Sequence, residues 1–217
     1  MVFHSVGTAL APASFAPGFT SRMKSANLCV TPTRRAFFMT ITVRFATAGD
    51  IPAIARIYGD AVLHGTASFE IEPPSESEMT RRQRVLLDGG YPYFVAEEGG
   101  AIAGYAYAGP YHTRVGYRFS VEDSIYVDPR MHKRGIGRLL LTRLIDEAPR
   151  RGFRQMIAVV GDSAQAGSLA LHRSAGFDLV GTIKNVGFKH GRWLDSVIMQ
   201  RPLGEGATTL PADLVKK

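Results

Sequence analysis

One stretch of the sequence, residues 120–160, constrains the fold more than any other. It begins with SVEDSIYVDP, continues through the basic glycine loop HKRGIGR into the leucine-rich LLLTRLI, and closes with the apolar QMIAVV. This pattern predicts a strand that ends at Val127, a short loop, a helix to about Arg151, and a strand buried on both faces. Because such a strand needs a covering layer on each side of its sheet, we expect an α/β fold with helices on both faces.

The flanking sequence predicts further elements. TITVRFA, residues 40–46, alternates like a half-buried strand, and Asp50 is placed to cap a first helix. A second helix starts at Ser75, with Glu78 at capping-box spacing, and ends before two glycines. A hairpin, a helix in SLALHRSAGF and two last strands with a turn at His190–Gly191 complete the chain. The predicted order is β α α β β β α β α β β, in a mixed, mostly antiparallel sheet.

The chain has room for one folded domain. It has 217 residues, 45% of them hydrophobic, which suits a single core rather than two. We assign residues 40–203 to that domain, residues 1–39 to a disordered or mis-called N-terminal extension, and residues 204–217 to a flexible C-terminal tail. TRRAFF resembles the start of a twin-arginine export signal, but the apolar stretch that should follow is missing. A transit peptide is the weaker alternative, and Met39 would be a natural start.

The net charge of +7 belongs largely to the N-terminal segment before Asp50. Five basic residues precede the first acidic residue, Asp50, and the remaining chain has 21 basic and 19 acidic residues, or +2. A nucleic-acid surface is therefore not expected. One cysteine, Cys29, excludes an internal disulfide and suits a reducing compartment. With no apolar run of about 18 residues and no HExxH or Cys/His cluster, we expect a cytoplasmic protein without membrane, nucleic-acid or metal partners.

The glycine loop predicts an anion site. Amide N–H groups at a helix N-terminus lack intrahelical partners and, with the helix dipole, attract anions such as a pyrophosphate. Gly135 and Gly137 let the backbone approach a ligand, and Lys133, Arg134 and Arg138 add positive charge. The loop matches neither a Walker A loop nor a dinucleotide fingerprint. The alternative for the loop taken by itself is a solvated basic helix start whose glycines merely shape a turn.

The wider context carries a family resemblance. VEDSIYVDPRMHKRGIGRLLLTRLI, VVGDSAQAGSLALHRSAGFDLVGTIKNVGFKHGRWLDSVIMQR and GPYHTRVGYRFSVE together resemble the GCN5-related N-acetyltransferase (GNAT) superfamily. Within it they are most similar to the phosphinothricin and methionine-sulfone N-acetyltransferases, over about residues 41–201. The resemblance implies a GNAT fold and a homodimeric enzyme. It implies acetyl transfer from acetyl-CoA to a small amine such as phosphinothricin, methionine sulfone or methionine sulfoximine.

In that superfamily the glycine loop holds the pyrophosphate of acetyl-CoA through backbone amides. The strand before it pairs with the pantetheine amides like an added β-strand. Gln165 stands where the family usually has Asn, so its longer side chain shifts that contact. The residues that the resemblance assigns to the coenzyme are Ile125, Tyr126, Val127, Lys133, Arg134, Gly135, Ile136, Gly137, Arg138, Gln165, Ser168 and Lys189.

Acetyl transfer to an amine needs a base for the ammonium proton, stabilisation of the oxyanion and departure of the thiolate. The resemblance assigns the base to Glu122, and the alternative is an ordinary surface acid at a strand bulge. Asp123 points to the opposite face of a regular strand and is the less suitable base. His172 is the candidate acid for the thiolate, and the alternative is a helix histidine packed at the sheet edge.

Substrate recognition is assigned by the same resemblance. Arg114 and Tyr117 match the family's substrate segment, and Phe69 lies in an early loop that forms a wall of the site. Arginine suits a substrate carboxylate because it binds such a group bidentately. Lys189 and Trp193 match the family near the coenzyme and the dimer contact, although a lone tryptophan is usually a core residue.

Other functions compete with this one. The nearest is an acetyltransferase for a protein N-terminus or a polyamine, but Arg114 and Arg118 make the substrate segment basic, whereas a polyamine needs an acidic groove. A non-catalytic acetyl-CoA-binding regulatory module is a second alternative, and the presence of Glu122 and His172 argues against it. A nucleic-acid binder is the third, and the charge distribution disfavours it.

Overall fold

The structure is a computed structural model that describes residues 40–211. The expectations for residues 1–39 lie outside the described residues. Within the described part the helices and strands follow the predicted order, with short 3₁₀ helices between some of them. Their bounds are β1 Thr42–Phe45, α1 Ile51–His64, α2 Glu76–Asp88, β2 Tyr93–Glu98, β3 Ala101–Pro110, β4 Ser120–Val127, α3 Ile136–Glu147, β5 Gln155–Gly161, α4 Ala166–Ser174, β6 Asp178–Lys189 and β7 Arg192–Pro202.

The strands of the described part form one sheet in the order β1-β2-β3-β4-β5-β7-β6. Neighbouring strands are antiparallel except for β4 and β5, which run parallel. The predicted mixed, mostly antiparallel sheet is therefore confirmed. Helix α3 makes the crossover that two parallel neighbours require.

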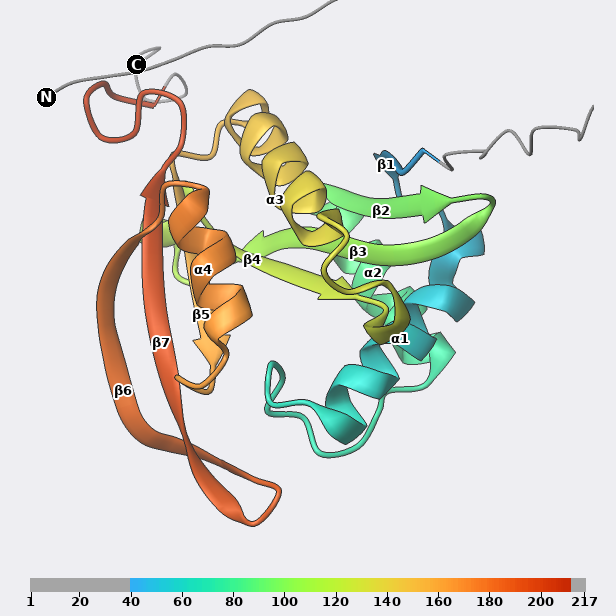
Figure 1. The fold of residues 1–217 in the computed structure, drawn as a ribbon. Helices are drawn as coiled ribbons and strands as arrows, with labels where there is room; N and C mark the ends of the chain where they lie inside the picture. Colours follow the sequence, from blue (N-terminus) through green and yellow to red (C-terminus); the bar gives the residue numbers. More distant parts are fainter. Residues whose placement is uncertain (1–39, 212–217) are drawn as a thin grey trace, which may run out of the picture. The chain divides into compact units, whose positions relative to one another are not determined.

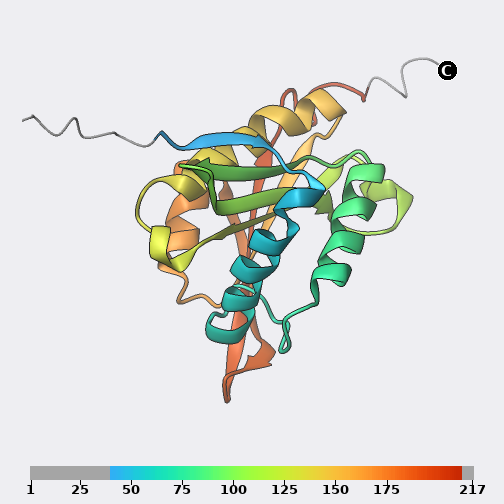
Figure 2. The ribbon, with the colours of Figure 1, turned by 90° about the vertical axis from the view of Figure 1, so that its right-hand side faces the viewer.

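Helices cover both faces of the sheet, as predicted. On one face, α3 and α4 pack over a core that includes the fully buried Leu140, Leu141 and Leu144. On the other, α1 and α2 pack over a second core that includes Ile54 and Ile57. Each such side chain stabilises the fold by about 2 kcal/mol through burial. Figure 1 shows α3 and α4 in front of the sheet, and Figure 2 shows α1 and α2 from the side.

The two predicted helix starts form in part. Ser75 accepts a hydrogen bond from the Glu78 amide at 3.2 Å, as the capping box predicts. The Glu78 carboxylate, however, binds the guanidinium of Arg82 instead of the N-cap amide. Asp50 precedes α1, but its carboxylate accepts from the Thr47 amide at 2.7 Å and not from the helix, so its predicted side-chain cap is absent.

Candidate active site

The parallel strands β4 and β5 diverge part-way along their length. They pair from Ser120 and Gln155 as far as Asp123 and Ala158. Beyond that point, within the described strands, β4 pairs with β3 alone and β5 with β7 alone. The β5-facing backbone groups of Ser124–Val127 therefore have no strand partner. An open edge of this kind can take up an extended ligand as an added strand.

Glu122 lies on β4 at this divergence. In register it stands between Gly109 of β3 and Ile157 of β5, and Gly109 approaches Leu86 of α2, so the Glu122 side chain is on the α1/α2 face. Burial, and then the charge of Asp123, raise the pKa of Glu122 to about 7, and no hydrogen bond from the described residues offsets this rise. A carboxyl group with a pKa near neutrality is suited to take a proton at physiological pH.

The glycine loop leads directly into the N-terminus of α3. Gly135 is the N-cap residue and has a φ of 79°, a left-handed conformation that glycine adopts without steric cost. Among the described residues no side chain caps this helix, so its first amide groups are left for an anion. Gly137 faces α4, where an added Cβ would lie 3.3 Å from Leu171 Cδ2. The backbone here fits the phosphate or pyrophosphate site that the sequence predicts.

The basic side chains of the loop have different surroundings. Arg134 turns away from the helix N-terminus and forms an ion pair with Glu98, whose side chain is only 6% exposed. Lys133 and Arg138 are exposed. The loop therefore offers backbone amides and two exposed cations to a ligand, while the guanidinium of Arg134 is already committed to the protein.

His172 of α4 forms a buried ion pair with Asp123 of β4. Its Nε2 lies 2.9 Å from Asp123 Oδ2, and its Nδ1–H donates to the Ser168 carbonyl at 2.8 Å. Burial works to lower the pKa of His172, but the hydrogen bond and charge of Asp123 outweigh it, so the pKa is raised. Asp123 Oδ1 is buried without a partner among the described residues. Glu122 and Asp123 thus point to opposite faces, as predicted, and both ring nitrogens of His172 are engaged.

Comparison with known proteins agrees with this geometry. The model of the acetyltransferase (GNAT) family matches residues 57–177. The chain belongs to the GNAT acetyltransferase family. A phosphinothricin N-acetyltransferase of Alcaligenes faecalis is 51% identical over 78% of this chain and 86% of its own. An L-methionine sulfoximine/L-methionine sulfone acetyltransferase of Salmonella typhimurium is 41% identical over 77% of this chain and 97% of its own.

A solved structure is similar as well. The phosphinothricin acetyltransferase of Sinorhizobium meliloti, in complex with AcCoA, is 52% identical, with a TM-score of 0.78 over 81% of this chain and 95% of its own. The family resemblance and the GNAT fold expected from the sequence are confirmed. In the described part of this acetyltransferase no helix is long and apolar enough to cross a membrane, and no three His, Cys, Asp or Glu side chains are grouped to hold a metal.

The β5–α4 loop of the acetyltransferase binds the segment after α1. Gln165 Nε2 donates to Thr66 Oγ1 at 2.9 Å, and the Thr66 hydroxyl donates to Asp162 Oδ2 at 3.1 Å. Asp162 has a φ of 75°. Several hydrogen-bond donors lower the pKa of its carboxyl group, and the Arg192 guanidinium has the largest effect. The side chain of Gln165 is thus turned toward Thr66. The sequence analysis did not identify Thr66 or Asp162. The signal available for Asp162 was the Gly-Asp pair that ends the buried strand.

Three predicted substrate residues occupy two places. Phe69 is 38% exposed and lies against Gly161 and Gly187, on the face that carries Glu122. Arg114 and Tyr117 lie in the β3–β4 connection, on either end of a 3₁₀ helix. Both are exposed, so they are accessible to a ligand. The structure brings Phe69 and Glu122 to one face and leaves the other two on the connection that leads into β4.

Two residues of the last hairpin have contrasting surroundings. Lys189 is 3% exposed, and its Nζ donates to the Ser68 carbonyl at 2.7 Å, so its ammonium is directed at the loop that carries Phe69. Trp193 is 62% exposed and packs edge-on against Phe188 at 5.2 Å. The expectation that a lone tryptophan is a core residue is therefore wrong, because this one lies near the turn of the β6–β7 hairpin, where it packs on the equally exposed Phe188.

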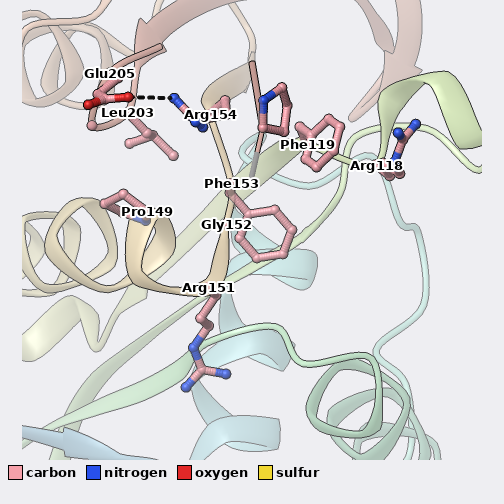
Figure 3. A pocket seen from close by; sticks show the side chains of 11 residues that line it. Arg118, Phe119, Pro149, Arg151, Gly152, Phe153, Arg154, Leu203 and Glu205 are labelled. Atoms are coloured by element: carbon pink, nitrogen blue, oxygen red, sulfur yellow. Dashed lines mark ion pairs between the residues drawn. The ribbon is translucent and has the colours of Figure 1, made fainter. Parts of the chain in front are cut away.

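A pocket of about 680 Å³ lies at the opposite ends of β4 and β5 from the divergence (Figure 3). Arg118, from the predicted substrate segment, lies on its wall with its guanidinium 4.4 Å from the centroid of the Phe119 ring. Arg154 binds the Leu210 carbonyl, so the described part of the C-terminal segment packs back onto this pocket. Its apolar lining includes Phe119, Pro149, Phe153 and Leu203.

Proposed function

We propose that this acetyltransferase moves the acetyl group of acetyl-CoA to the amine of a small amino-acid-like substrate by direct attack, with Glu122 as general base. The observation that carries the proposal is the open edge of β4, which leads from Glu122 to the uncapped N-terminus of α3. An extended thioester with a pyrophosphate at its far end matches both features. The amides of α3 suit the pyrophosphate, and the free strand edge suits the pantetheine.

The coenzyme contacts divide into main-chain and side-chain groups. The backbone of Ile125–Val127 would pair with the pantetheine, and the amides of Gly135–Arg138 would hold the pyrophosphate. The Arg134 guanidinium is paired with Glu98, so we assign it no contact with the coenzyme. Gln165 and Lys189 bind the segment after α1, so we assign both to the substrate wall and not to the coenzyme.

Glu122 supplies the chemistry at the amine. An amino acid reaches the site mostly as an ammonium at neutral pH, and it must lose a proton before it can attack. A carboxylate with a pKa of about 7 can take this proton directly or through water. Of the β4 amides without a strand partner, the one nearest Glu122 would donate to the charge that develops on the acyl oxygen, and those further along the strand would pair with the pantetheine.

A general-acid role for His172 stays a prediction. Its two ring nitrogens bind the Ser168 carbonyl and Asp123, so any proton it gives to the thiolate must first leave one of these partners. The geometry favours a role in which the ion pair fixes α4 against β4. Ser168 contributes its carbonyl to this arrangement.

The substrate class follows from the relatives. We propose phosphinothricin, methionine sulfone and methionine sulfoximine as substrates, because two relatives that span most of this chain are named for them. Arg114 would bind the substrate carboxylate, with Tyr117 beside it. Phe69 would form the wall opposite the amine.

We also propose a homodimer through the β6–β7 hairpin. β6 is the edge strand of the sheet, and β6 and its neighbour β7 carry exposed apolar side chains. An apolar sheet edge of this kind favours association with a second copy. Sedimentation analysis of a Phe188→Asp variant, which should be monomeric, tests this. The side chains are Leu179, Val180, Ile183, Val186, Phe188 and Trp193.

One assay tests the reaction. Thiol release from acetyl-CoA is measured over a panel of free amino acids, the three proposed substrates, polyamines and a peptide N-terminus, with Glu122→Gln alongside. Turnover should be confined to amino-acid-like amines and should be lost in Glu122→Gln. Equal turnover in that variant would remove the base assignment, and acetyl-CoA binding without turnover on any amine would favour a regulatory module.

A further inference from the structure

The segment that carries Phe69, residues 65–70, has no regular secondary structure, and we call it the wall loop. The Phe69 ring packs on two glycines that belong to different strands. A Cβ at Gly161 of β5 would lie 2.9 Å from Phe69 Cε1, and a Cβ at Gly187 of β6 would lie closer still to the ring. Figure 1 shows the segment after α1 extending toward β5 and β7. The Phe69 ring therefore lies directly on the backbone of the sheet, and a side chain at Gly161 or Gly187 would clash with it.

The wall loop lies on the active-site face. Glu122 pairs with Ile157 in the parallel register, and Gly161 follows four residues later on β5, so alternation places them on one face. The strands diverge between these two positions. Phe69 thus lies on the β5 side of the divergence, over β5 and β6, on the face that carries Glu122.

Polar groups of the last hairpin and of the β5–α4 loop hold the wall loop at three points. At its start, His190 Nε2 donates to the Gly65 carbonyl at 3.1 Å. Thr66 is bound by the β5–α4 loop, as described above. Next to Phe69, Lys189 Nζ donates to the Ser68 carbonyl at 2.7 Å, across 121 residues of sequence.

A buried lysine is an unusual donor for the hydrogen bond to the Ser68 carbonyl. Its side chain is buried, and a buried ammonium costs free energy unless it is paired. Its hydrogen-bond partner is a neutral carbonyl, and the nearest compensation is the charge of Glu70. Glu70 is itself held by Tyr58 and Arg82, at 2.8 and 2.7 Å. An apolar residue would fill the same place at lower cost, but it would leave the Ser68 carbonyl without its donor.

We infer that Lys189 is a positioning residue: it fixes the Ser68 carbonyl, and through it Phe69, so that the ring sets the size of the amine substrate accepted. This inference rests on the proposed function. It differs from the coenzyme contact that family resemblance assigns to Lys189, because the ammonium is directed at the wall loop. The wall is therefore preorganised by the last hairpin of the fold.

The test compares Lys189→Met with Lys184→Met. Lys184 is exposed on the same strand and pairs with Asp195, so it is a matched control. Loss of a hydrogen bond from a charged donor should speed hydrogen exchange of residues 65–70 by about tenfold in the coenzyme-free protein. In Lys184→Met the exchange should not change. Lys189→Gln keeps a donor near the carbonyl and should restore part of the protection.

Steady-state kinetics give the second readout. In Lys189→Met the KM for the amine should rise by about tenfold, while kcat falls little, because binding of the amine is what is lost. Acetyl-CoA affinity should be unchanged, and amines with longer side chains should gain relative kcat/KM. A loss of acetyl-CoA affinity with an unchanged amine KM would instead support the coenzyme assignment and overturn the inference.

Two further outcomes are decisive. If exchange accelerates over the whole domain in Lys189→Met, the lysine is a general stabiliser and the inference is wrong. If protection of residues 65–70 is unchanged, it is also wrong. Failure of the proposed function would appear differently, as absence of turnover with every amine in the unsubstituted protein, and the exchange comparison would still be interpretable.

Discussion

The raised pKa of Glu122 has a consequence for stability that can be measured apart from catalysis. Burial and the charge of Asp123 raise this pKa from an ordinary 4.5 to about 7. That difference corresponds to about 3 kcal/mol of free energy by which the folded protein disfavours the ionised carboxylate. Because the side chain keeps part of its exposure, this figure is an upper bound.

The sign follows from the two pKa values. Below pH 4.5 the carboxyl group is protonated in the folded and the unfolded chain, and it adds no penalty. As the pH rises from 4.5 to about 7, the unfolded chain ionises first, so the free energy of unfolding falls. Above about 7 the loss is complete and stays constant. Glu122→Gln removes the charge, so at pH 8 this variant should be more stable by up to about 3 kcal/mol.

Urea unfolding at about pH 5 and about pH 8 measures this effect as the difference between Glu122→Gln and the unsubstituted protein. The difference should grow by about 2 kcal/mol between the two pH values. Glu72→Gln, at an exposed position, is the control and should show no such change. A stability difference that is the same at both pH values, or that favours the unsubstituted protein at pH 8, would refute the reasoning.

Four more outcomes are expected. The kcat/KM for the amine should rise with pH and level off above about 7, since the ionised carboxylate is the base; a profile without this rise contradicts it. Asp123→Asn should leave the His172 cation buried without its partner, so the pKa of His172 measured by NMR titration should fall. The free energy of unfolding should fall by about 3 kcal/mol, most strongly below the raised pKa of His172. An unchanged titration of His172 would argue against the pair. Gly137→Ala should weaken acetyl-CoA binding in calorimetry more than Lys133→Ala, because amides bind the pyrophosphate, and the reverse order would disprove this. Arg134→Met should reduce the free energy of unfolding by about 3 kcal/mol, because Glu98 then stays buried without its partner. Acetyl-CoA affinity should change little. A loss of affinity at unchanged stability would instead indicate that Arg134 contacts the coenzyme.

The sequence predicted the elements well because their signals are local. The order of helices and strands, the loop at Gly135 and the opposite faces of Glu122 and Asp123 depend on periodicity within a few residues. The alternation of a strand fixes which side chains share a face as soon as the strand is recognised. For this reason the position of Glu122 on β4 could be anticipated before its surroundings were known.

The contacts that the sequence did not predict are long-range. His172 and Asp123 are 49 residues apart, and Lys189 and Ser68 are 121 apart, so no local pattern joins them. Family resemblance placed Lys189 near the coenzyme, but resemblance gives a position and not the direction of a side chain. The same holds for Trp193, whose exposure follows from its place near the turn of the β6–β7 hairpin at the end of the sheet.

The divergence of β4 and β5 also bears on how long the protein lasts. A strand edge without a strand partner in the middle of a sheet leaves backbone groups of Ser124–Val127 that no other described strand pairs with, although the Val127 carbonyl is bound by the His132 ring. Acetyl-CoA would complete the sheet, so its binding free energy would add to the free energy of unfolding. Resistance to heat and to proteolysis should then follow the ratio of acetyl-CoA to its dissociation constant. A cell short of acetyl-CoA would hold less of this protein, and its abundance would report the acetyl supply.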